Sequence, residues 1–132
     1  MRLVSILLAA GALSVAAPAL AHHSFAMFDR DKNLTMSGTV TEFEWTNPHV
    51  WIHMSVPDQT GKAPVWSFEM QAIQADMAGG WRSDSVKPGD KVSIEFHPLK
   101  DGSRGGELLF GTLADGKRLA AQAARLPVPK AP

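Results

Sequence analysis

Apolar and polar residues alternate along five segments of the chain, as they do in half-buried β-strands. In the segment 49–56 (HVWIHMSV), Val50, Ile52 and Met54 have one parity, and the polar and aromatic residues have the other. Side chains of opposite parity point to opposite faces of a strand, so each segment offers one face to a core. Gly38 predicts a bulge or bend in the first segment. The five segments cover residues 34–45, 49–56, 65–71, 91–97 and 107–113.

One helical segment lies between the third and fourth strand segments. Residues 72–78 (AIQADMA) favour a short helix, and Gly79-Gly80 directly after them is a typical helix stop. The order β-β-β-α-β-β is that of the OB-fold, a small Greek-key barrel. We therefore predict an all-β fold, a five-stranded OB-like barrel with one short helix between strands 3 and 4.

The N-terminus has a different pattern, typical of a secretory signal peptide. Met1 and Arg2 precede an apolar run over residues 3–17, and residues 18–21 (PALA) end in an A-x-A cleavage site. The apolar run is short for a membrane span. We therefore predict a signal peptide over 1–21, a barrel domain over 22–119 and a disordered Ala/Pro-rich tail over 120–132. The mature chain should be periplasmic or secreted and have no transmembrane segment.

Charge and composition exclude several function classes. The chain has 13 basic and 13 acidic residues and no basic stripe, which argues against a nucleic-acid partner. It has no cysteine, so disulfides, thiolate metal sites and cysteine catalysis are excluded. No hydrolase elbow, nucleotide-binding loop or His-Glu-x-x-His motif is present. The sequence therefore predicts a binding protein and not an enzyme.

Cleavage after Ala21 would make His22 the first residue of the mature chain. Its α-amine and imidazole can chelate one metal ion together, and both are good ligands for Cu(II), the highest member of the Irving–Williams order. We therefore hypothesise a copper site in which His22 supplies two nitrogens. The alternative is a solvated terminus with no assembled site, as chain ends commonly are.

Further histidines offer ligands to complete such a site. His49, Trp51 and His53 share one parity, opposite to the apolar set, and form an exposed or groove-facing row on the second strand. His49 and His53 are the principal candidates, and His23 and His97 are lesser ones. The alternatives are a local capping role for His49 and a solvated strand position for His53.

Tryptophans indicate a second kind of site. Trp45 and Trp51 flank the segment 46–49 (TNPH). Large aromatic residues mostly fill a core or its rim, but OB-folds also use the barrel face to bind oligosaccharides and oligonucleotides. Trp45 and Trp51 are therefore candidates for a ligand surface in a metal-independent module that binds a glycan, peptide or envelope partner. The strand carboxylates have no identifiable partner and are interpreted as solvated: Glu42, Glu44, Glu69 and Glu95.

Several motifs together resemble a known family. They are the start His22-His23-Ser24-Phe25, the segment 38–49 ending in Trp45-Thr46-Asn47-Pro48-His49, the strand 66–69 and the turn Lys87-Pro88-Gly89-Asp90. In these motifs the chain, from His22 to about Leu119, resembles a family of small exported bacterial proteins of unknown function. The resemblance implies a periplasmic or secreted OB-like barrel and carries no activity and no functional residue. We therefore predict an exported binding protein with copper as its first candidate ligand.

Overall fold

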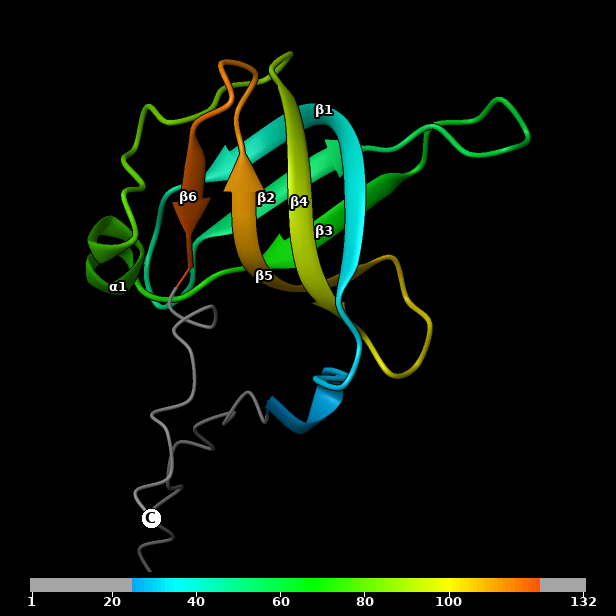
Figure 1. Ribbon diagram of the computed structural model, residues 1–132, viewed down its shortest axis with the longest axis horizontal. Coiled ribbons are helices and arrows are strands. Elements are labelled where there is room, and N and C mark those ends of the chain that lie inside the picture. Colours follow the sequence, from blue (N-terminus) through cyan, green and yellow to red (C-terminus); the bar gives the residue numbers. More distant parts are fainter. Residues whose placement is uncertain (1–24, 122–132) are drawn as a thin grey trace, which may run out of the picture.

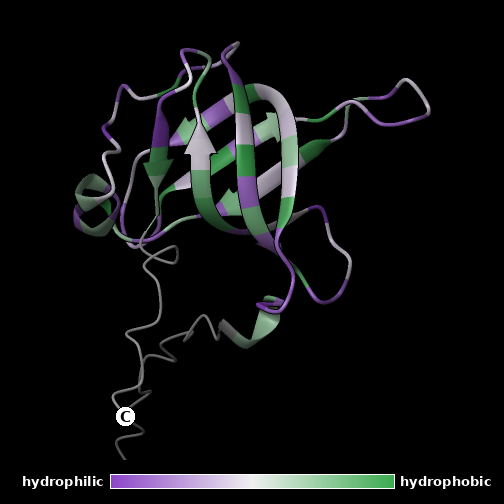
Figure 2. Ribbon diagram, viewed as in Figure 1, coloured by the Kyte–Doolittle hydropathy of each residue, from purple (hydrophilic) through white to green (hydrophobic). Residues whose placement is uncertain are grey.

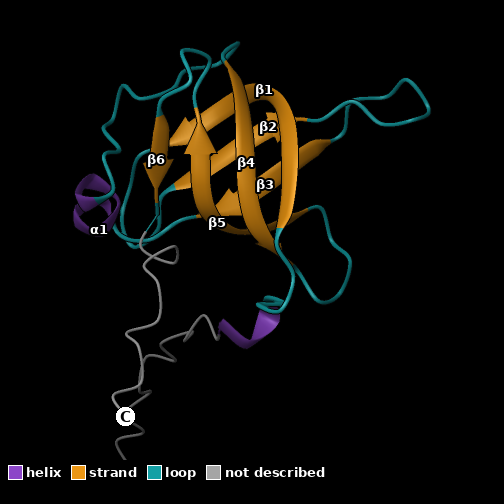
Figure 3. Ribbon diagram, in the orientation of Figure 1, coloured by secondary structure: helices purple, strands orange, loops and turns teal. Residues whose placement is uncertain are grey.

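The computed structural model describes residues 25–121 (Figure 3). The described elements are a short 3₁₀ turn, one α-helix and six strands. In chain order they are η1 (Phe25–Met27), β1 (Leu34–Glu44), β2 (Trp51–Ser55), β3 (Val65–Glu69), α1 (Ile73–Ala78), β4 (Lys91–Pro98), β5 (Gly105–Thr112) and β6 (Arg118–Ala120). The predicted signal peptide, His22, His23 and most of the predicted tail lie outside the described residues. Neither described helix is long and apolar enough to cross a membrane.

Five of the strands close into a barrel. The strand order is β3-β2-β1-β4-β5, and a parallel pairing between β3 and β5 joins the two ends. β1 curves over the barrel, pairing with β4 through its first half and with β2 through its second (Figure 1). The helix α1 lies between β3 and β4 in the chain, beside one end of the barrel (Figure 1). This confirms the predicted all-β, OB-like barrel with one short α-helix between strands 3 and 4.

A sixth strand extends the sheet beyond the barrel. β6 pairs with β5 in antiparallel fashion, with Leu119 opposite Gly111. Ala120 donates its backbone N–H to Gly79 at 3.1 Å, and Ala121 donates to Leu109 at 2.8 Å. Alternation over three residues is too brief to indicate a strand, so the sequence predicts none there. β6 ends at Ala120, the first residue of the predicted tail.

The core is built from the inward faces of the strands. Figure 2 shows hydrophobic and hydrophilic residues alternating along β4, where Val92, Ile94 and Phe96 are buried. Phe96 meets Phe68 of β3 edge to face, with ring centroids 4.8 Å apart. Trp81, which follows α1, is fully buried and lies 6.2 Å from the ring of Phe43. Burial of these rings fills the interior of the barrel.

A β-bulge in β1 reverses the side-chain alternation of that strand. Val40 pairs with Met54 and Glu42 pairs with His53, so Thr41 has no partner on β2. An extra residue of this kind shifts all following side chains to the opposite face. Phe43 consequently packs against the core, and Glu42 and Glu44 face outward.

Gly38, where the sequence predicts a bulge or bend, lies where β1 passes from its pairing with β4 to its pairing with β2. A Cβ there would lie 2.4 Å from the carbonyl oxygen of Ser55. The glycine therefore permits a close approach of β1 to β2, and the bulge lies three residues further on, at Thr41.

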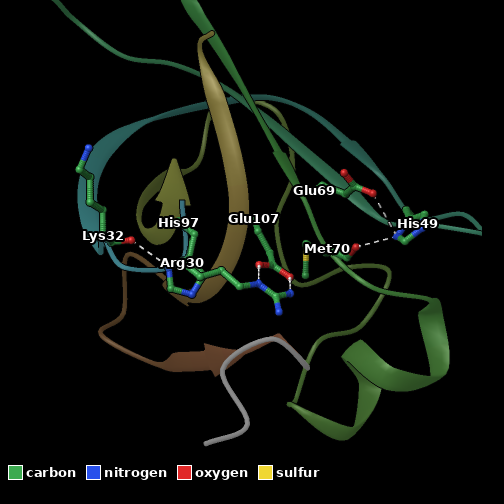
Figure 4. A network of polar contacts seen from close by, with 7 residues as sticks. All are labelled: Arg30, Lys32, His49, Glu69, Met70, His97 and Glu107. Atoms are coloured by element: carbon green, nitrogen blue, oxygen red, sulfur yellow. Dashed lines mark hydrogen bonds and ion pairs between the residues drawn. The ribbon is translucent and has the colours of Figure 1, made fainter. Parts of the chain in front are cut away.

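The segment before β1, residues 25–33, is fastened to the outside of the barrel. Phe28 is buried and forms an isolated antiparallel bridge with Leu99, which follows β4. Arg30 forms two hydrogen bonds with the Glu107 carboxylate, at 2.9 and 3.2 Å (Figure 4). The Glu107 side chain is only 2% exposed, so the guanidinium supplies the charge partner that a buried carboxylate requires.

Candidate functional site

The outward row predicted on β2 is present. Val50, Ile52 and Met54 are fully buried, whereas His49, Trp51 and His53 are half-buried on the other face. The rings of Trp51 and His53 are nearly parallel, at 5°, with centroids 6.2 Å apart. The row lies on the β2–β3 face, which is the face that OB-folds commonly use for ligands.

His53 is held at both ring nitrogens. Nε2 lies 2.9 Å from Glu44 Oε1, and Nδ1 lies 2.7 Å from Ser67 Oγ. An ionised carboxylate only accepts hydrogen bonds, so Nε2–H donates to Glu44, and Nδ1 of the neutral ring accepts from the Ser67 hydroxyl. β1 and β3, on either side of β2, therefore fix the orientation of the imidazole.

Glu42 completes a cluster around this histidine. One ligand atom from each of Glu42, Glu44 and His53 lies within 4.8 Å of the others. Among residues 25–121 this is the one group of three or more His, Asp or Glu side chains close enough to share a metal ion. Two carboxylates and one imidazole form a nitrogen–oxygen donor set that suits divalent transition metals, copper and zinc among them.

His49 lies outside this cluster. Its Nδ1 donates to the Met70 carbonyl at 2.9 Å and lies 3.4 Å from Glu69 Oε1 (Figure 4). His49 and His53 are four positions apart in the sequence, which corresponds to about 13 Å between their Cα atoms in an extended strand. The His49 ring is directed to Met70 and Glu69 and is not part of the group around His53. The structure therefore does not bring the two principal histidine candidates together.

His97 lies on β4, in a different part of the barrel surface. Its Nδ1 donates to the carbonyl of Lys32 at 2.8 Å (Figure 4). Its strand neighbour is Glu107 on β5. His97 is not part of the group formed by Glu42, Glu44 and His53. His22 and His23 are outside the described residues, so their predicted role stays a prediction.

A small pocket adjoins the row on β2. Its volume is about 170 Å³. Met27, Phe28, Trp51 and Leu99 form apolar walls, and Ser67 and Glu69 supply polar groups. Ser67 lines the pocket and also contacts His53 of the cluster, so the two sites are adjacent. The N-terminal segment closes the pocket on one side, through Met27 and Phe28.

The two predicted ligand-surface tryptophans have different positions. Trp51 lines the pocket on the outer face. Trp45 packs instead against the core, 5.6 Å from the ring of Phe43. Trp81 and Trp66 also belong to or pack on the core, as the sequence predicts for most large aromatic residues. Only Trp51 of the four therefore belongs to a candidate binding surface.

Of the carboxylates interpreted as solvated, Glu42 is exposed, and Glu44 and Glu95 are partly exposed. The interpretation was wrong for Glu69, which is buried, and three of the four have side-chain partners. Glu44 pairs with His53, Glu69 approaches His49, and Glu95 accepts hydrogen bonds from Arg118. The sequence signal for the first pair would have been a bulge at Thr41, but no residue type marks that position. The strand pairing was needed to place Glu42 and Glu44 beside a histidine.

The fold and this cluster define a small five-stranded OB-like barrel with a potential metal-ligand set on its outer face. The model of DUF6152, a family of unknown function, matches residues 10–108. The match covers most of the chain, which therefore belongs to this family, and it includes all of the cluster. No curated protein and no solved structure matches the chain.

Proposed function

We propose that this protein is an exported metal-binding protein that takes up Cu(II) at Glu42, Glu44 and His53. The observation that carries the proposal is the convergence of these three side chains, whose ligand atoms lie within 4.8 Å of one another. For a given set of nitrogen and oxygen ligands, Cu(II) binds more tightly than the other divalent first-row metals. This order is why copper is the metal proposed.

The environment of His53 supports its role as a ligand. A metal ion at Nε2 would require the other tautomer of the neutral ring, in which its single proton is on Nδ1 and not on Nε2. Nδ1 would then donate to Ser67 Oγ, 2.7 Å away, and the Glu44 carboxylate would be free to bind the metal as well. A hydroxyl both donates and accepts, so Ser67 is compatible with both states. Such outer partners orient metal-bound imidazoles in known sites.

The mature N-terminus is the proposed source of further nitrogen ligands. His22 precedes Met27 by five residues, which reach at most about 17 Å. Met27 lines the pocket together with Trp51 and Ser67, both of which contact His53. Addition of the His22 amine and imidazole to the cluster would provide five donors. Export by the predicted signal peptide is required, because only cleavage frees this amine.

Copper titration of protein processed by its own export tests the proposal. Mass spectrometry establishes the N-terminal residue, and EPR reports the nitrogen ligands of Cu(II). We expect one tight equivalent, at least tenfold weaker binding in His53→Ala and unchanged binding in the matched control His97→Ala. An alanine inserted before His22 should also weaken binding, because it moves the amine away. Equal affinity in the wild type and His53→Ala would reject the site.

A second candidate function rests on the pocket. Apolar walls and a few polar groups are typical of small ligand sites, and this pocket lies on the β2–β3 face used by other OB-folds. The protein would then be a metal-independent binding module. Replacement of Trp51 should abolish ligand capture in that case, whereas His53→Ala should leave any metal-independent ligand bound.

A further inference from the structure

Two glutamates on the outward-facing side of the barrel sheet lie side by side. Both are buried by the residues around them, but they differ in their charge partners. Glu69 of β3 and Glu107 of β5 are neighbours in the parallel strand pair. Glu69 is 6% exposed and Glu107 is 1% exposed. Arg30 contacts both oxygens of Glu107. Figure 4 shows the guanidinium of Arg30 at Glu107 and the ring of His49 beside Glu69.

The polar environment of Glu69 is poor for a buried anion. Within the part of the chain that the structure describes, its carboxylate has one polar side-chain contact, His49 Nδ1 at 3.4 Å. That nitrogen already donates to the Met70 carbonyl at 2.9 Å. Removing a carboxylate from water is costly unless a charged or hydrogen-bonding partner replaces the water. Glu69 therefore lacks a partner equivalent to Arg30.

The pocket offers the space for such a partner. Glu69 is one of its lining residues, together with Ser67 and the apolar residues Met27, Phe28 and Trp51. A cation in this position could donate to Glu69 while its apolar body contacts the walls. An indole also attracts cations through its π face. The volume of about 170 Å³ limits the ligand to a small molecule.

We propose that this pocket binds a small organic ammonium ion, with its N–H groups directed at Glu69 and its apolar part against Trp51, Met27 and Phe28. The inference gives a ligand class to the second candidate function and does not require a metal ion. Carboxylates and apolar walls together discriminate against neutral isosteres and against anions. The ligand class is therefore a primary or secondary amine with a short hydrocarbon or aromatic body.

Benzylammonium and its neutral isostere benzyl alcohol are the probes that test this inference. Both are titrated into the full mature chain with EDTA present, and binding is followed by calorimetry and by the assigned indole N–H resonance of Trp51. We expect the ammonium to bind at least about tenfold more tightly than the alcohol, as for a charge-assisted hydrogen bond. Equal affinities would overturn the proposal, and this comparison needs no variant to fold.

Two matched variants identify which carboxylate makes benzylammonium bind more tightly than benzyl alcohol. Glu69→Gln keeps the shape of the side chain and should reduce the ammonium-to-alcohol ratio to near one. Glu44→Gln removes a carboxylate of the proposed copper site but does not line the pocket, so it should leave the ratio unchanged. Wild-type protein that binds no copper but still prefers the ammonium would reject the metal site alone. Wild-type protein that binds copper but has equal affinities for the two probes would reject the pocket alone.

The amino terminus of the chain is itself an ammonium ion and is the competing occupant. Acetylation of the α-amine distinguishes the two sources. If the pocket is open to small molecules, acetylation leaves the affinity for benzylammonium unchanged. Binding that is absent before acetylation and present afterwards would overturn the proposal, because the tethered amine would then be the resident cation.

Discussion

His53 Nε2 lies 2.9 Å from Glu44 Oε1 across the β1–β2 pair, although Glu44 is directly opposite Trp51 and not opposite His53. The contact is diagonal, and diagonal neighbours on a sheet face are within reach of long side chains. Glu42 occupies the position opposite His53. Both carboxylates reach one imidazole because the bulge at Thr41 turns them outward together.

Ser67→Ala tests the outer partner of this imidazole. The substitution keeps all proposed metal ligands but removes the hydroxyl that contacts Nδ1. Loss of such partners in metal sites costs 10–100-fold in affinity, so we expect about tenfold weaker Cu(II) binding by calorimetry. Ser93→Ala, on β4, is the control and should bind copper normally. Normal binding by Ser67→Ala would mean that the hydroxyl does not orient His53.

Arg30→Met tests the attachment of the N-terminal segment. The Glu107 side chain is 2% exposed and would lose its charge partner, while the Arg30 side chain is half exposed. Removal of one member of a buried pair costs about 3–5 kcal/mol, and partial exposure of the arginine favours the lower end. We expect a loss of about 3 kcal/mol in the free energy of unfolding by urea.

The double variant Arg30→Met/Glu107→Gln separates the charge effect from packing. It removes the unpaired charge, so it should be more stable than Arg30→Met alone. If the two variants were equally unstable, loss of contacts by the arginine stem, and not an uncompensated carboxylate, would be the cause.

Gly111→Ala tests the close packing around Trp81. A Cβ at position 111 would lie 2.6 Å from Cη2 of this fully buried ring. Overpacking of a core costs about 1–3 kcal/mol, because the ring has no open space to enter. Thermal unfolding should therefore occur at a lower temperature. Thr112→Ala, at the next and partly exposed position, is the comparison, and a smaller loss for Gly111→Ala than for it would contradict this packing.

Lys87→Met tests the turn before β4. The hydrogen bond from the Lys87 side chain, and then that from its backbone N–H, hold the pKa of Asp90 below its ordinary value of 3.8. The substitution removes the first of these bonds, so the pKa of Asp90 should rise in an NMR titration. The pKa of Asp101, which Ser103 lowers at a separate turn, should stay as it is.

The sign of the associated stability effect follows from the direction of that shift. A carboxyl whose pKa is lower in the folded state stabilises the fold above its ordinary pKa, and this stabilisation is lost as pH falls through the folded pKa. Lys87→Met should therefore lower stability near neutral pH and have little effect in strong acid. The reverse pH profile would rule out this account of the turn.

The turn also explains one motif of the family resemblance in structural terms. Gly89 has a φ of +95°, a conformation that glycine adopts without strain. Its N–H donates to Val40, and the N–H of Val40 donates to Asp90, each at 2.8 Å. Lys87-Pro88-Gly89-Asp90 thus holds β1 immediately before its bulge, which connects this motif to the position of Glu42.

Local patterning in the sequence was sufficient for the barrel and for the outward row on β2. Alternation places Val50, Ile52 and Met54 in the core because one strand face is buried and the other is not. The helix α1 was also predictable from the local sequence, since Gly79-Gly80 ends a short helical segment. These features depend on residues a few positions apart, and the chain carries that information directly.

Only the tertiary structure decided which polar side chains meet. The partners of His53 come from β1 and β3, the pocket joins the N-terminal segment to β2 and β3, and His49 is directed to Glu69 instead of to His53. Strand register and the single extra residue at Thr41 set these contacts. A shift of one residue exchanges the two faces of a strand, so alternation alone cannot determine them.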